Sequence, residues 1–467
     1  MSGSMSGFYI TAMAVLTLAA FFVTRARAAG LRTAGRAALH SLPIYHGLLA
    51  AAMVFAPMAL LFAAAMPIIE RTAISQALGA LQSDVAADVL KRATALRETQ
   101  NLIAGQHVGT PSDALKAAAA AYANVHRNAD RGLLGAGVLL GSIGLFVARR
   151  SVSATFRARN RFERFTLAVL VLCATVAVLT TIGIVFSVFF ETYRFFFDPA
   201  LKGKPTIGQF LFGTEWNPQA ALRADQGDIK TAFGFLPLLT GTLLITLIAI
   251  CVAGPLGLFS AIYLSEYATQ RMRAWIKPVL EILAGIPTVV LGFFAALTVA
   301  PLIRGWGQHL GLDIASESAL AAGLVMGMMI IPFISSLSDD VINAVPQSLR
   351  DGAYALGATK SETIKQVILP AALPGIVSAF MLAISRAIGE TMIVVMAAGL
   401  AANLTFNPLD VVTTITVQIK TILVGDQEFD SAKTLAAFAL GFVLFFITLV
   451  LNIIALHIVN KYREQYD

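Results

Sequence analysis

Residues 235–264 read FLPLLTGTLLITLIAICVAGPLGLFSAIYL, thirty consecutive positions without a charged side chain. An α-helix rises about 1.5 Å per residue, so about 20 apolar residues cross the ~30 Å hydrocarbon core of a bilayer. This stretch is therefore long enough to span a membrane. Because the bilayer interior offers no water to the backbone, we expect a helix, in which each N–H and C=O is bonded within the segment.

Eight more apolar stretches resemble this one in length or composition. They cover residues 8–24, 46–68, 132–148, 165–190, 278–302, 318–338, 371–400 and 434–459. Of the 467 residues, 57% are hydrophobic and only 13% are charged, whereas soluble domains carry about 25% charged residues. The composition excludes a soluble globule and a disordered chain. It predicts an all-α, polytopic helical membrane protein with about nine transmembrane helices.

Arginine and lysine are concentrated in every second segment between the spans, which places them on one side of the membrane. They cluster in residues 25–36, 149–164, 271–277, 350–365 and 461–463. Since positive flanks stay cytoplasmic, the N-terminus is expected outside and the C-terminus inside. The net charge of +7 is then explained by these flanks, and no nucleic-acid partner is needed. A signal peptide is the alternative reading of residues 1–28, but the positive charges follow the apolar run, which favours an uncleaved anchor.

Composition also divides the chain into two parts. Residues 1–150 hold three spans and form an N-terminal extension, whereas residues 151–467 hold six spans. In the third span, Gly137 and Gly141 form a G-x-x-x-G pair, which would let another helix approach closely. The pattern is common in apolar sequence and indicates no particular partner.

An outward segment, residues 70–131, separates the second and third spans. Apolar residues recur there at spacings of three and four, which is typical of a helix; they are Ile74, Leu78, Leu81, Val85 and Val89. Gly105, Gly109 and Pro111 interrupt this stripe, and Ser112 is a candidate N-cap for a second helix over 113–126. The segment therefore predicts a helical hairpin.

The loop 339–370 carries the strongest local signals on the cytoplasmic side. Pro346 suits the first turn of a short helix, and Gly357 suits its C-terminal stop. Thr359 and Glu362 have the form of a capping box that opens a second short helix. We expect that helix to end at the proline that closes the loop. By geometry alone, an ordinary amphipathic loop is the favoured interpretation.

Sequence detail favours a more specific interpretation. Residues 351–357 read DGAYALG, and residues 367–370 read VILP. This resembles the EAA loop of ABC importer permeases, whose pattern is Glu-Ala-Ala, three residues, Gly, nine residues, Ile-x-Leu-Pro. The positions that carry the resemblance are Asp351, in place of the usual Glu, with Ala353, Gly357, Leu369 and Pro370.

In that family the loop is a coupling helix that sits in a groove of a separate ATPase. The resemblance implies two ATP-binding subunits and a second permease subunit, because this chain supplies one such loop. No G-x-x-x-x-G-K-[ST] phosphate cradle occurs in the sequence. We therefore expect a transmembrane subunit that is not an enzyme, with ATP hydrolysed by a partner.

Two charged residues interrupt the eighth span, within the sequence SRAIGET at 385–391. Arg386 and Glu390 are four residues apart, so on one helix they would share a face and pair. Each charge costs about 2.5–3.5 kcal/mol at the bilayer centre, so both should face the bundle interior or an aqueous path. The pair either fixes helix packing or forms an anion path. Arginine suits phosphate or sulfate because its planar fork offers several donors.

Four further segments, together with this one, are similar to the phosphate-specific importer permeases of the PstC type. They are 212–216 (FGTEW), 255–257 (PLG), 263–267 (YLSEY) and 284–290 (AGIPTVV). The resemblance implies a six-helix ABC importer core in the cytoplasmic (inner) membrane. It also implies an extracytoplasmic phosphate-binding protein that delivers substrate, and a phosphate path that includes Arg386 and Glu390.

The sequence thus predicts a permease subunit for inorganic phosphate, surrounded by membrane lipid and without a cofactor. The six histidines are scattered and offer no metal spacing. The alternatives are an ABC permease for another oxyanion or small solute, a transporter driven by an ion gradient, and a membrane sensor or scaffold. The role of residues 1–150 stays open.

Overall fold

A computed structural model describes residues 2–33, 39–81, 89–107, 109–153, 155–199, 201, 204–218, 233–424 and 431–462. Within these ranges, nine helices are long and apolar enough to cross a membrane. This confirms the predicted all-α, polytopic architecture. The chain forms two compact units, Met1–Leu179 and Thr180–Asp467, and helix α6 (Ala158–Phe197) runs from the first into the second.

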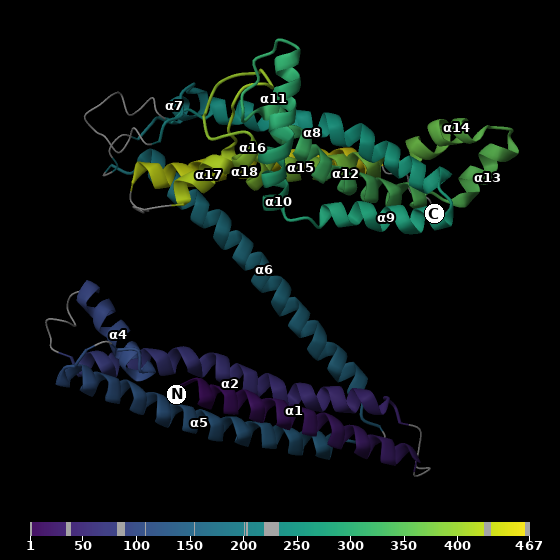
Figure 1. Cartoon of the computed structure of the whole chain (residues 1–467). Helices are drawn as coiled ribbons and strands as arrows, with labels where there is room; N and C mark the ends of the chain where they lie inside the picture. Colours follow the sequence, from purple (N-terminus) through teal and green to yellow (C-terminus); the bar gives the residue numbers. More distant parts are fainter. Residues whose placement is uncertain are drawn as a thin grey trace. The chain divides into compact units, whose positions relative to one another are not determined.

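The first unit is built on three long helices that pack side by side (Figure 1). They are α1 (Ser2–Thr33), α2 (Pro43–Gly79) and α5 (Asp113–Ser151), and the shorter α4 (Val89–Ala104) packs against α5. The close approach predicted at the G-x-x-x-G pair is present. A side chain at Gly137 would overlap the Tyr9 ring, and one at Gly141 would lie 2.8 Å from Leu16.

The segment between α2 and α5 differs in part from the predicted hairpin. Ser112 caps α5, since its Oγ accepts a hydrogen bond from the N–H of Leu115 at 3.3 Å. From there α5 runs unbroken to Ser151, so the helix expected over 113–126 and the third span are one continuous helix. The expected apolar stripe crosses the end of α2 at Gly79, and its residue Val85 lies outside the described residues.

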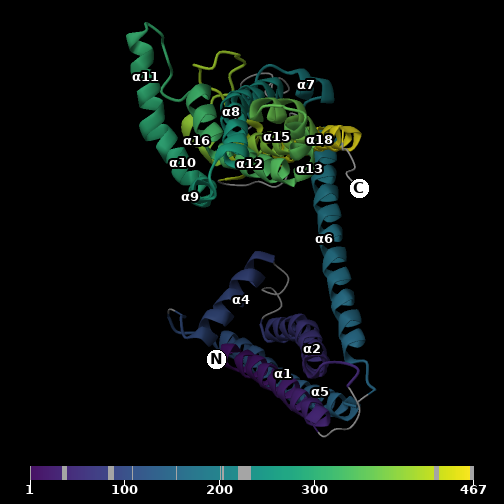
Figure 2. The same ribbon diagram turned by 90° about the vertical axis from the view of Figure 1, so that its right-hand side faces the viewer.

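The second unit holds the remaining described helices. They are α7 (Ile207–Phe212), α8 (Leu236–Ile262), α9 (Gln270–Ala284), α10 (Thr288–Phe294), α11 (Ala300–His309), α12 (Ala319–Ala344), α13 (Gln347–Ala355), α14 (Lys360–Thr363), α15 (Leu369–Ile388), α16 (Met392–Ala397), α17 (Ile415–Leu423) and α18 (Ala432–Tyr462). Helix α12 lies among its neighbours in Figure 2 and packs against α8, α9, α15 and α16. Small residues permit this contact: a side chain at Gly327 would lie 3.0 Å from the carbonyl oxygen of Ala249 on α8.

Three single turns of π-helix interrupt the spans of this unit. They are η3 (Tyr263–Tyr267), η4 (Ala295–Val299) and η5 (Ile364–Ile368). In η5 the N–H of Leu369 bonds to the carbonyl oxygen of Ile364, five residues back. Such bulges add one residue to a helix without ending it.

This geometry corrects two predicted boundaries. The second helix of the loop does not end at Pro370, because η5 joins α14 to α15 and the proline falls in the first turn of α15, where its missing N–H is tolerated. The sixth span does not begin at residue 278. Helix α9 ends at Ala284, and a new helix starts at Thr288 after the Gly285–Pro287 break.

Candidate functional site

The loop between α12 and α15 has the predicted helix–turn–helix form. Pro346 precedes α13, and Gly357 adopts a positive φ of 84°. The N–H of Gly357 bonds to Tyr354, and that of Ala358 bonds to Ala353, at 2.9 and 3.1 Å. These two bonds form a Schellman motif, which satisfies carbonyl groups at the helix end and needs glycine at the left-handed position.

The second helix of the loop begins at the predicted capping box. The carboxylate of Glu362 accepts a hydrogen bond from the Thr359 N–H at 2.8 Å, while Thr359 Oγ1 accepts one from the Glu362 N–H at 3.4 Å. Two otherwise unpaired backbone donors are thereby satisfied. The turn between α13 and α14 is thus fixed on both sides, and the two helices form one stiff unit at the end of unit 2 opposite α7 (Figure 1).

The side chains of the EAA-like segment divide between two faces of this loop. Asp351 is exposed and accepts a hydrogen bond from Gln347, whereas Ala353 is buried. Leu369 packs against a buried apolar cluster that includes Ile342 and Ile364. The most exposed apolar side chain of the loop is Leu356, with 91% of its surface accessible. Sequence reasoning did not single it out, although it directly precedes the turn glycine.

Arg350 fixes α13 to the rest of the unit. It is only 8% exposed, and its guanidinium donates to Glu266 Oε1 at 3.2 and 3.3 Å and to the carbonyl oxygen of Ile342 at 2.8 Å. A third group, the carbonyl oxygen of Val345, also accepts from it. Since Glu266 lies in η3 and Ile342 in α12, one side chain joins the loop to the ends of two spans.

A second charge cluster joins α9 to α12. The fully buried Asp339 accepts hydrogen bonds from Arg273 at 2.8 and 3.1 Å and from Lys277 at 3.0 Å. Lys277 also donates to Asp340 at 2.9 Å. This bond to Asp340, supported by Asp339, raises the pKa of Lys277 against the lowering effect of burial. The lysine therefore stays charged at physiological pH and holds α9 in place.

Arg386 and Glu390 do not share a helix face as predicted. Helix α15 ends at Ile388, and Gly389 forms its C-cap, so the two residues lie on either side of a break. Among the residues that the structure describes, neither side chain forms an ion pair. Because the helix ends at Gly389, the periodicity that would align positions four apart does not continue to Glu390.

Each of the two side chains has a different environment. The guanidinium of Arg386 is exposed and lies 4.0 Å from the ring centroid of Phe333 on α12, a cation–π contact that orients it. Glu390 Oε1 accepts hydrogen bonds from the N–H groups of Met392 and Ile393 at 3.0 and 3.4 Å. Glu390 therefore holds the start of α16, whereas no carboxylate within the described part of the chain pairs with Arg386.

The loop and Arg386 lie at the two ends of one rod. From Lys360 to Ile388 the backbone is helical without interruption, through α14, η5 and α15. Beside Arg386, Ser385 is half-buried, and its buried hydroxyl oxygen has no hydrogen-bond partner among the described residues. The exposed guanidinium of Arg386 thus stands where the rod ends, and its planar fork can bind an oxyanion.

Comparisons with known proteins match two families to the chain. The family described as binding-protein-dependent transport system inner membrane component matches residues 253–464, and the family described as phosphate ATP-binding cassette transporter matches residues 10–180. A probable ABC transporter permease of Bacillus subtilis is 35% identical over 236 residues, which cover 50% of this chain and 72% of that protein. A probable phosphate transport permease, PstC, of Methanocaldococcus jannaschii is 30% identical over 62% of this chain and 93% of its own length.

The chain belongs to the PstC-type family of phosphate transport permeases. Among solved structures, a chain of a bacterial alginate ABC transporter, crystallised with its pentasaccharide-bound periplasmic protein, is 14% identical. It covers 66% of the permease and 99% of that chain, with a TM-score of 0.45.

The two family matches fall on different units of the permease. The match over 253–464 contains the α13–α14 loop and Arg386, and the match over 10–180 contains the three packed helices of unit 1. The permease is therefore a multi-pass membrane subunit of an ABC transporter.

Proposed function

We propose that the permease carries inorganic phosphate inward across the cytoplasmic membrane, driven by ATP hydrolysis on a separate subunit. The observation that carries this proposal is the single helical rod from Lys360 to Ile388, with the EAA-like loop at one end and Arg386 at the other. A push on the loop would move the end of the rod that holds the arginine. Family membership, and the phosphate transport named for the relatives, supports the choice of substrate.

The ATPase is expected to dock on the tip of the α13–α14 loop. Leu356 and Tyr354 present exposed apolar surface there, 91% and 41% accessible, beside the exposed carboxylate of Asp351. Apolar anchors rimmed by polar groups are typical of protein–protein contacts. Since Arg350 joins the loop to Glu266 and α12, a displacement of α13 would reach both spans together.

The proposed assembly contains two ATP-binding subunits and two permease subunits. One permease chain supplies one coupling loop, so a second permease, different from this one, would dock the second ATPase. An extracytoplasmic phosphate-binding protein would deliver the substrate. Membership of a family described as binding-protein-dependent supports an ATPase and a binding protein as partners in general.

Arg386 is proposed to meet the phosphate. Its fork is oriented by Phe333 and carries no carboxylate partner among the described residues, so its donors are available to an oxyanion. Glu390, held by the N–H groups of α16, would keep negative charge close to the break. It would limit how tightly phosphate is held, which favours release.

For the chain as a whole, we propose the N-terminus outside and the C-terminus inside, from the distribution of arginine and lysine. Residues 1–150 would form an extension with an outward segment over 70–131. Residues 151–467 would form the transport core with the coupling loop at 339–370.

Uptake of labelled phosphate into proteoliposomes that hold the permease with its co-expressed partners tests this proposal. Uptake should require ATP, resist excess sulfate and fall at least tenfold in Arg386→Ala, with partial recovery in Arg386→Lys. Arg304→Ala removes the same charge from an arginine that donates to Ser316 and should transport normally. ATP-independent uptake, or full activity in Arg386→Ala, would refute the proposed mechanism.

A further inference from the structure

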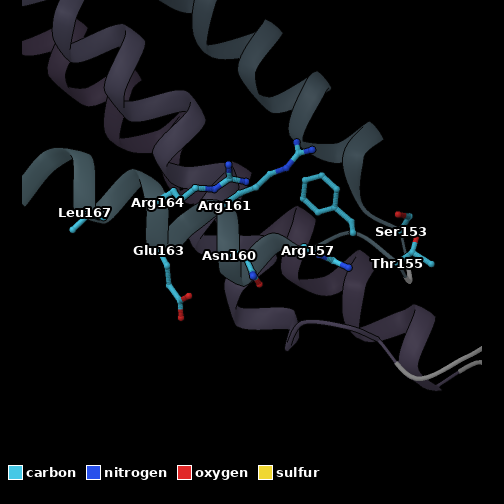
Figure 3. A pocket seen from close by; sticks show the side chains of 9 residues that line it. Ser153, Thr155, Arg157, Asn160, Arg161, Glu163, Arg164 and Leu167 are labelled. Carbon is cyan, nitrogen blue, oxygen red and sulfur yellow. The ribbon is translucent and has the colours of Figure 1, made fainter.

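A cavity of about 660 Å³ lies where α5 ends and α6 begins, within unit 1. Its polar lining combines three arginines with hydroxyl and amide groups: Ser153, Thr155, Arg157, Asn160, Arg161 and Arg164. Figure 3 shows Arg161 and Arg164 extending toward the same side of α6, while Glu163 points to the other side. Residues three apart on a helix share a face, so two guanidinium groups serve one cavity.

The positive charge of this cavity exceeds the negative charge of its lining, three arginines against one glutamate. Glu163, the acidic residue of the lining, accepts a hydrogen bond from Arg159 Nε at 2.6 Å. Among the residues that the structure describes, Arg157, Arg161 and Arg164 form no ion pair. Three cations around one cavity repel each other, and a bound anion would relieve that repulsion.

Contacts with neighbouring residues fix the side chains and backbone that line the cavity. The Arg161 guanidinium lies 4.6 Å from the ring centroid of Phe156, and that ring lies 5.8 Å from the buried His46 of α2. The N–H of Arg159 donates to Ser41 Oγ at 3.2 Å, which ties the start of α6 to the segment before α2. The arginine cluster is therefore held at a corner made by three helices, α2, α5 and α6.

The other side of the cavity is apolar and faces outward. Leu167 lines it and is 60% exposed. The exposed Leu170 and Leu172 follow on α6 within a membrane-spanning stretch. A soluble anion would not need an exposed apolar surface beside its binding site. A lipid does, because its phosphate lies at the interface while its acyl chains run along the apolar helix surface.

We propose that this corner cavity, the α5–α6 basic pocket, binds the headgroup of an anionic phospholipid. Arg157, Arg161 and Arg164 would hold phosphate oxygens, Ser153 and Thr155 would add neutral donors, and the acyl chains would lie along α6 from Leu167 onward. A headgroup with two phosphates fits best, because three arginines and about 660 Å³ exceed what one phosphate needs.

Exchange of a fluorescent cardiolipin onto the purified full-length permease tests the pocket. The double variant Arg161→Gln/Arg164→Gln should weaken binding by about fivefold for each arginine removed. The double variant Arg149→Gln/Arg150→Gln removes the same charge from exposed residues at the end of α5 that do not line the cavity, and it should bind as the unchanged protein does. Glu163→Gln should bind at least as tightly, because it removes the acidic residue from the lining.

Three results would overturn the proposal. Equal weakening in both double variants would reduce the effect to general surface charge, and unchanged binding in the Arg161/Arg164 variant would remove the site altogether. Displacement of the labelled lipid by millimolar inorganic phosphate would assign the pocket to a free anion. Neutral phosphatidylcholine, measured in parallel, should not displace the labelled cardiolipin.

Discussion

Two glycines of the α13–α14 loop should respond in opposite directions to the same change. At Gly357 the backbone has a φ of 84°, and an added Cβ would meet no atom within 4 Å. The cost of Gly357→Ala is therefore conformational alone, about 1–2 kcal/mol for an L-residue in the left-handed region. The stiffer unfolded chain offsets about 0.4–1 kcal/mol of this, which leaves a loss of about 0.8 kcal/mol.

Gly352 lies inside α13 with ordinary helical geometry and also has open space around it. There the substitution by alanine should stabilise the helix by about 0.5–1 kcal/mol. Gly352→Ala is thus a matched control, because it makes the same substitution within the same loop. A third variant, Gly357→Asn, should lose less than Gly357→Ala, because asparagine tolerates the left-handed region better.

Hydrogen exchange of residues 347–368 in the purified complex measures these differences directly. Since 1.4 kcal/mol is a tenfold change in an equilibrium, Gly357→Ala should speed exchange about fourfold and Gly352→Ala should slow it about two- to fivefold. In proteoliposomes, Gly357→Ala should also import less phosphate per ATP hydrolysed.

Two results would refute this reasoning. Exchange that changes in the same direction in both variants would show that the turn geometry does not hold the loop. Faster exchange with an unchanged ratio of phosphate to ATP would show that the stiffness of the loop has no part in coupling.

Three further variants test other contacts. Asp339→Asn leaves two cations beside a neutral buried group, so it should lower the melting temperature of the purified protein by an amount equivalent to about 3–5 kcal/mol. The control Asp340→Asn changes a side chain that is 63% exposed and should cost under ~1 kcal/mol. Equal effects of the two variants would contradict the buried cluster. Arg350→Lys keeps the positive charge but loses the planar guanidinium that reaches three acceptors, so ATP hydrolysis should continue while phosphate uptake falls severalfold. Normal uptake in this variant would contradict the proposed role of Arg350 in joining the loop to the spans. Gly137→Ala should destabilise unit 1 by about 1–3 kcal/mol, because the added methyl group would overlap a tyrosine ring of α1. Gly132→Ala should not destabilise it, because an added Cβ there meets no atom within 4 Å. Thermal unfolding in detergent measures the difference between the two variants.

The features that the sequence predicted correctly depend on neighbouring residues. The presence of nine apolar spans in the described residues, the capping box of Thr359 with Glu362, and the turn at Gly357 all follow from neighbouring positions. The Arg386–Glu390 pair was wrong for a related reason, since the helical spacing was applied across Gly389, where the helix ends.

The features that the sequence could not predict join distant parts of the chain. Arg350 and Glu266 are 84 residues apart, and Arg273 and Asp339 are 66 residues apart. Nothing in the local pattern shows that these charges meet, because their distance is set by the packing of α8, α9 and α12. Positive residues near a membrane surface were explained by orientation alone, although Arg273, Lys277 and Arg350 also hold the helices together.

The π-turn η5 sets the rotational phase between the loop and Arg386. Each residue of an α-helix turns the chain by about 100°, and a π-turn holds one residue more than the α-helical geometry requires. Deleting one residue within Ile364–Ile368 would convert that turn to ordinary α-helix and leave Arg386 on the side of α15 that faces Phe333. The same deletion a few residues later in α15 would swing the arginine by about 100° and away from that ring. We therefore expect the permease to tolerate a one-residue deletion at this turn better than the same deletion between Leu369 and Arg386.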